Sequence, residues 1–154
     1  MRRLITLEIP SVTEYIDIVD AAAQHIGKIY GRFDDDGLFF LSVSTRELVA
    51  NAIKHGNNWD AAKSVRTDFY LDGSSLKISV TDRSPKRFDP GSMYRAEGDE
   101  ALSNHGRGYM IIEQVMDGIE YEWLDPGNRI TIRKDIQPAA SFSADESDLR
   151  EQRL

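Results

Sequence analysis

Four polar residues on one predicted helix have the types and the spacing that phosphate chemistry needs. Glu47, Asn51 and His55 follow one another at intervals of four residues, and Lys54 adjoins His55, so all of them lie on one broad helical face. An Asn oxygen is a hard, neutral ligand for Mg²⁺, and a nearby Glu can accept the proton of an attacking hydroxyl or water. The alternative is an ordinary solvent-exposed stripe on a surface helix.

The remainder of this helix bears on that choice, because it is rich in apolar residues. They are Leu38, Phe39, Phe40, Leu41, Val43, Leu48, Val49, Ala52 and Ile53. A helix that is apolar over most of its surface is buried, and a polar stripe on a buried helix must line a cavity or be paired. The sequence therefore favours a site over a solvated stripe.

A phosphate-binding element is expected at a second place, ahead of a later helix. Gly106 and Gly108 let backbone N–H groups approach an anion, the helix N-terminus adds its dipole, and His105 or Arg107 could add positive charge. A plain turn at the start of a helix explains the two glycines equally well. No G-x-x-x-x-G-K-[ST] motif is present, and Ile111 replaces the third glycine of a dinucleotide fingerprint.

The periodicity of apolar residues predicts the elements that must position these groups. A strand over 2–9 ends at Pro10, Ser11 has the N-cap position of a first helix, and the acidic run at 34–36 caps a second helix that ends near Gly56. The other expected elements are strands at 64–71, 76–81, 119–124 and 129–134 and a short helix at about 109–116. This order predicts an α+β fold, a two-layer sandwich with helices on one face of a mostly antiparallel sheet.

Composition limits the classes of protein that remain. The 154 residues fit one domain, expected at 1–136, with a charged and disordered tail at 137–154, and the stretch 82–105 is expected to form a functional lid. A formal net charge of -7 argues against direct binding to nucleic acid or to an anionic membrane surface, and the absence of Cys excludes thiolate metal sites. With no signal-peptide pattern or spanning segment, a cytoplasmic location is expected.

Three motifs in order resemble those of a known family. Glu47-x-x-x-Asn51-Ala52-x-Lys54-His55-Gly56 resembles the N-box of the ATP-binding fold shared by gyrase, the heat-shock chaperone, sensor histidine kinases and the mismatch-repair ATPase. Val80-Thr81-Asp82 with Phe88-Asp89-Pro90 resembles the first G-box, and Gly106-Arg107-Gly108-Tyr109 through Asp117 resembles the second. Together with the ending at 129–134, the set is similar to anti-sigma-factor serine kinases of the RsbW and SpoIIAB type, over about residues 4–135.

The resemblance implies ATP and Mg²⁺ bound between the second helix and the lid. It implies that Asn51 holds Mg²⁺, that Asp82 bonds the adenine amino group, and that Glu47 is the general base toward a Ser or Thr hydroxyl on a partner. The other implied cofactor-binding residues are Lys54, His55, Phe88, His105, Gly106, Arg107, Gly108 and Tyr109. Members of this family sequester a sigma factor, release it when an anti-anti-sigma antagonist competes, phosphorylate that antagonist, and often act as homodimers.

One motif departs from the family pattern. The first G-box usually reads Asp-x-Gly-x-Gly, whereas this chain has Asp82-Arg83-Ser84-Pro85-Lys86. Because Ser and Lys do not readily adopt backbone conformations reserved for glycine, the loop is expected to follow another path. Two hypotheses follow. One is an ATP-dependent protein serine/threonine kinase that binds a sigma factor. The other is a module of the same fold without catalysis, which either binds nucleotide or binds proteins independently of nucleotide.

Overall fold

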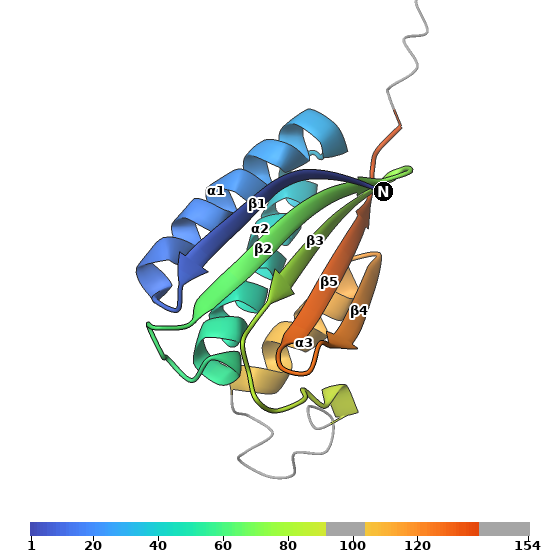
Figure 1. Cartoon of the computed structure of the whole chain (residues 1–154). Helices are drawn as coiled ribbons and strands as arrows, with labels where there is room; N and C mark the ends of the chain where they lie inside the picture. Colours follow the sequence, from blue (N-terminus) through green and yellow to red (C-terminus); the bar gives the residue numbers. More distant parts are fainter. Residues whose placement is uncertain (92–103, 139–154) are drawn as a thin grey trace, which may run out of the picture.

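Three helices cover one face of a five-stranded antiparallel sheet in the computed structural model, which describes residues 1–91 and 104–138 (Figure 1). The sheet has the order β1-β2-β3-β5-β4, and all four neighbouring pairs are antiparallel. The strands are β1 Arg2–Pro10, β2 Ser64–Asp72, β3 Ser75–Thr81, β4 Gly118–Trp123 and β5 Asn128–Asp135. The predicted α+β sandwich is therefore confirmed.

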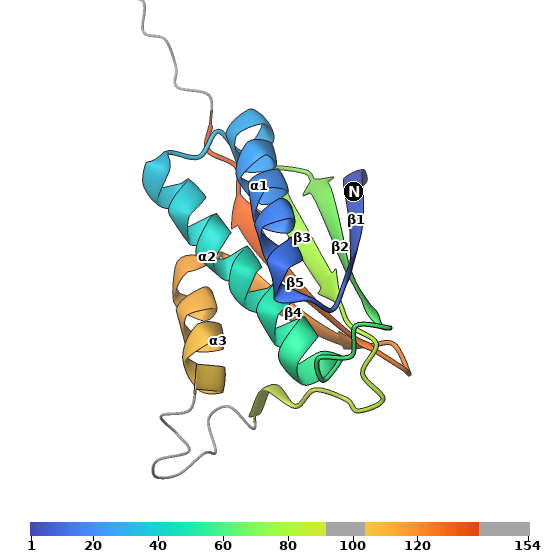
Figure 2. The same cartoon turned by 90° about the vertical axis from the view of Figure 1, so that its left-hand side faces the viewer.

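The helices form a single layer, which Figure 2 shows beside the sheet. They are α1 Ile16–Ile26, α2 Asp35–Asn51 and α3 Asn104–Val115. The Asp34 carboxylate accepts a hydrogen bond from the Gly37 backbone N–H at 2.8 Å, so the acidic run caps α2 as predicted. A π-helical turn, Ala52–Gly56, carries α2 to its predicted end.

The predicted cap of the first helix is wrong. A 3₁₀ turn, Thr13–Tyr15, precedes α1, and no side chain caps that turn. The Ser11 hydroxyl instead donates to the Lys63 carbonyl at 2.9 Å and accepts from Asn57 Nδ2 at 2.7 Å. Ser11 is buried, so its hydroxyl takes the partners that the chain before β2 offers and is not available to the helix.

The core lies between the two layers and fixes α2 against the sheet. Its fully buried members include Leu41, Leu48 and Val49 of α2, Ile53 of the π-helical turn, Val65 and Phe69 of β2, Leu76 and Ile78 of β3, Ile112 of α3 and Ile132 of β5. α3 packs beside α2, as Figure 2 shows. Packing against the sheet and against α3 thereby holds the polar stripe of α2 next to α3.

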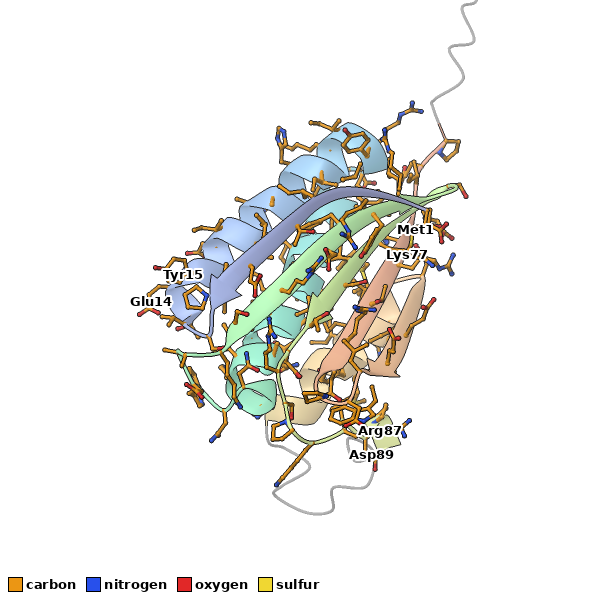
Figure 3. The ribbon with its side chains drawn as sticks, viewed as in Figure 1. Met1, Glu14, Tyr15, Lys77, Arg87 and Asp89 are labelled. Atoms are coloured by element: carbon orange, nitrogen blue, oxygen red, sulfur yellow. The ribbon has the colours of Figure 1, made fainter. Side chains whose placement is uncertain are left out.

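The other face of the sheet carries polar and charged side chains, which Figure 3 draws toward the viewer. Lys77 Nζ lies 2.9 Å from Asp72, and the Met1 amino group lies 3.8 Å from the same carboxylate. Asp68 is only 1% exposed on this face, because Arg66 and Arg3 cover it at 2.8 and 3.4 Å. This face is therefore stabilised by ion pairs and hydrogen bonds.

Two predictions lie outside the described residues. The centre of the expected lid, 92–103, and most of the expected tail, 139–154, are not described. Within 1–91 and 104–138, no helix is long and apolar enough to cross a membrane.

Candidate functional site

The last turns of α2 place the four predicted polar residues in different surroundings. Asn51 is buried, Glu47 and Lys54 are half-buried, and His55 is exposed. Lys54 Nζ lies 5.7 Å from the ring centroid of Trp59, which follows the helix end. The exposure of these four residues thus ranges from buried to exposed. They do not form the ordinary solvent-exposed stripe that was the alternative.

Asn51 is the most informative of these residues. No acceptor in the part of the chain that the structure describes takes a hydrogen bond from its buried Nδ2. Tyr109 of α3 is buried beside it. Burial raises the pKa of the Tyr109 hydroxyl, and the approach of the Asn51 amide lowers it by a smaller amount, although this approach does not have the geometry of a full hydrogen bond. A buried amide without a partner is costly, and a bound ligand would remove that cost.

Glu47 meets α3 at Gly108. A methyl group built at Gly108 would lie 2.5 Å from Glu47 Cγ and would overlap the Glu47 carboxyl group. Any side chain at position 108 therefore requires Glu47 to move, which explains why glycine stands there. The second motif and the N-box helix are in direct contact through this pair.

The predicted position of the glycines relative to α3 needs a correction. They were expected ahead of the helix, but α3 begins at Asn104 and includes both. Gly106 lies in the first turn, where backbone N–H groups have no partner within the helix, and Gly108 lies farther along. The side chains of His105 and Arg107 are outside the described part, so their predicted roles stay predictions.

Asp82 stands at the end of β3 and contacts the end of α2. It is 9% exposed, and its Oδ1 accepts hydrogen bonds from the backbone N–H groups of Ser84 and Asn128, both at 2.9 Å. A methyl at Gly56 would lie 2.5 Å from Asp82 Cγ and would overlap Oδ2. Glycine at the end of the N-box thus lets the helix backbone approach the Asp82 carboxylate.

Aromatic rings join the first and second motifs. The Phe88 ring centroid lies 5.2 Å from that of Tyr109 and 5.5 Å from that of Tyr121. Tyr121 comes from the inner face of β4 and was not among the predicted site residues. The apolar–acidic alternation of that strand was the signal that could have assigned it to the interior.

The altered first motif is held by side chains. Ser84 Oγ donates to the Lys86 carbonyl at 2.9 Å and accepts from the Lys86 N–H at 3.1 Å. Neither residue has a positive φ, in agreement with the expected different path. Asn57 Oδ1 accepts from the Arg83 N–H at 2.7 Å, and Asn128 Oδ1 accepts from the Phe88 N–H at 2.6 Å. Sequence reasoning did not single out either asparagine as an anchor.

A pocket of about 510 Å³ adjoins this loop on the side of β4 and β5. Phe88, Tyr121 and Asn128 contribute to its lining, and no residue of α2 does. It is therefore separate from the Glu47–Asn51 stripe.

Comparison with known proteins gives the family. The profile described as histidine kinase-like ATPase domain matches residues 9–134. The chain belongs to this family. The matched range includes all three contacts between motifs, which join Glu47 with Gly108, Gly56 with Asp82 and Phe88 with Tyr109.

Two solved structures are similar in fold to this histidine kinase-like ATPase domain. One contains the RsbU and RsbW domains of Rv1364c from Mycobacterium tuberculosis, with a TM-score of 0.60 and 17% identity over 88% of this chain. The chain spans 34% of that protein. The other is the SiaB–SiaC complex from Pseudomonas aeruginosa, with a TM-score of 0.58 and 12% identity over 86% of this chain and 89% of that one. No curated protein matches the sequence.

Proposed function

We propose that this histidine kinase-like ATPase domain is an anti-sigma regulatory factor that phosphorylates a Ser or Thr of an anti-anti-sigma antagonist. The observation that carries the proposal is the pair formed by Glu47, held half-buried against Gly108, and Asn51, whose buried Nδ2 has no protein partner among the described residues. The half-buried Glu47 carboxylate can act as a general base. The Asn51 Nδ2 group is a donor that needs an acceptor such as a phosphate oxygen, and Oδ1 of the same amide is the kind of oxygen that Mg²⁺ binds.

The residues present fit ATP and Mg²⁺. Asn51 would hold the metal, Asp82 the adenine amino group, and Gly106, in the first turn of α3, would direct a backbone N–H toward phosphate. Lys54 and Arg107 would supply positive charge, and His55 and His105 would supply ring N–H donors, while Phe88 and Tyr109 form an apolar boundary. When bound with its metal, ATP supplies the phosphoryl group. Glu47 accepts the proton of the partner's hydroxyl.

The proposed partners are a sigma factor and an antagonist protein, with a homodimer as the active form and the cytoplasm as the site of action. The fold similarity to a structure containing an RsbW domain and to a SiaB–SiaC complex supports this class of partner. Control of transcription by holding a protein is also consistent with the net charge of -7, which disfavours direct binding to DNA.

The test of catalysis is transfer of labelled phosphate from ATP to a candidate antagonist. Glu47→Gln should lower the rate of transfer by about 10²-fold or more and leave ATP affinity nearly unchanged, because the amide cannot accept the proton. Glu14→Gln is the matched control, since Glu14 is exposed in the turn before α1 (Figure 3). Unchanged transfer in the Glu47 variant would remove this residue from the role of base.

A second candidate is a protein-binding module without catalysis. It is favoured by the loop Asp82–Lys86, which lacks the usual glycines and is tied by the Ser84 hydroxyl. Such a module, whether it binds nucleotide or acts independently of it, would transfer no phosphate to the antagonist. Transfer of labelled phosphate from ATP by the unaltered protein would reject it.

A further inference from the structure

Asn128 holds the loop after β3 at several points from a single buried side chain. Its Oδ1 accepts from the Phe88 N–H at 2.6 Å, and its Nδ2 donates to the Lys86 carbonyl at 3.0 Å. Nδ2 also lies 3.3 Å from Asp82 Oδ1 and 3.4 Å from Oδ2. Asn128 is 6% exposed. It therefore spans the segment in which the family pattern has its glycines, and Figure 3 shows Arg87 and Asp89 where this segment passes the start of β5.

The two oxygens of Asp82 are left in different states by these bonds. Oδ1 receives the Ser84 N–H and the Asn128 N–H at 2.9 Å each, in addition to the longer approach of Nδ2. Oδ2 receives only the 3.4 Å approach of the shared Nδ2 and packs against the Gly56 backbone, where no side chain covers it. A carboxylate oxygen accepts about two hydrogen bonds, so Oδ1 is saturated and Oδ2 retains acceptor capacity.

We propose that Asn128 is a positioning residue that turns Asp82 Oδ2 toward the nucleotide and so sets the preference for a purine with an exocyclic amine. This inference rests on the proposed function, because it assigns a determinant of specificity to the same ATP site. Asn128 fixes loop positions 82, 86 and 88 by hydrogen bonds, and the loop thereby keeps its shape without glycines at 84 and 86.

The experiment compares two ligands that differ by one group, ATP and purine riboside triphosphate, which lacks the amine. Calorimetry gives the dissociation constant of each for the unaltered protein, Asn128→Asp, Asn128→Ala and Asn57→Ala. Asn128→Asp keeps the shape and the acceptor for Phe88 but places an oxygen against Asp82. Asn128→Ala keeps the backbone N–H on Oδ1. Asn57→Ala is the matched control, since it releases the same loop at Arg83 without a bond to Asp82.

The unaltered protein should prefer ATP by about tenfold or more, the worth of one hydrogen bond to a carboxylate. The ratio of the two dissociation constants should fall toward one in both Asn128 variants. Asn57→Ala should weaken the binding of both triphosphates by the same factor and leave this ratio unchanged. Thermal unfolding of the free proteins identifies any variant that fails to fold, and the remaining Asn128 variant then decides. Equal weakening of both ligands in the Asn128 variants, or no preference in the unaltered protein, would overturn the inference. Absence of any nucleotide binding by the unaltered protein would instead refute the proposed function.

Discussion

Because Gly108 contacts Glu47, the effect of Gly108→Ala on the free energy of unfolding should change sign when the Glu47 side chain is shortened. Replacing an interior helical Gly by Ala normally raises the free energy of unfolding by about 0.5–1 kcal/mol. Here the new methyl would lie 2.5 Å from Glu47 Cγ, and overpacking of this kind costs about 1–3 kcal/mol. Gly108→Ala should therefore lower the free energy of unfolding by about 1 kcal/mol in the native background.

The same substitution should stabilise the protein once Glu47 is shortened. In a Glu47→Ala background the overlapping atoms are gone, so Gly108→Ala should give the full helical gain of about 0.5–1 kcal/mol. The coupling energy between the two positions is then about 2 kcal/mol, well above the 0.3–0.5 kcal/mol scatter of independent sites. Urea unfolding of the four proteins measures it. Additive effects would show that the Glu47 side chain moves aside at little cost and is not held against Gly108.

Three further predictions concern groups outside this contact. Burial opposes ionisation of Asp68, but Arg66 and other donors outweigh burial and lower its pKa below 3.8. The ionised carboxylate therefore contributes to the free energy of unfolding above pH 3.8, and this contribution is lost as pH falls further. Urea midpoints of Asp68→Asn should fall less than those of the unaltered protein below pH 3.8. Burial raises the pKa of Tyr109 above 10, so the free energy of unfolding should decline as pH rises above that value, and urea midpoints of Tyr109→Phe should show a smaller decline. Arg46 bridges α1 and α2 by contacts of 2.6 Å to Asp17 and 3.1 Å to Asp20. Because Arg46 is partly exposed, Arg46→Leu should lower the free energy of unfolding by only about 0.5–1 kcal/mol in chemical denaturation. A decrease of more than about 3 kcal/mol would contradict this prediction.

The elements that local chemistry determines were predictable from the sequence. The acidic cap of α2, its apolar surface and the hairpin between β2 and β3 each depend on residues a few positions apart. The order of these elements was sufficient for the α+β sandwich. The N-box residues were also predictable as a group, because helical spacing alone places them on one face.

The features that sequence reasoning missed depend on partners far along the chain. Ser11 has the type and position of a helix cap, yet its partners lie at Asn57 and Lys63. Asn128 binds Asp82, which is 46 positions earlier, and no local pattern separates it from an ordinary turn asparagine. The Asn128 side chain holds the loop in which the family pattern has glycines, and this role is visible only once the pairing of β3 with β5 is known.

Titration of the intact chain with Mg-ATP is the sharpest test of the proposed ATP site. We expect saturable binding of one nucleotide per chain, with an affinity about tenfold or more weaker in Asn51→Ala, because that variant would lose its contact with the metal. No detectable binding up to millimolar Mg-ATP, or an affinity unchanged by Asn51→Ala, would contradict the account.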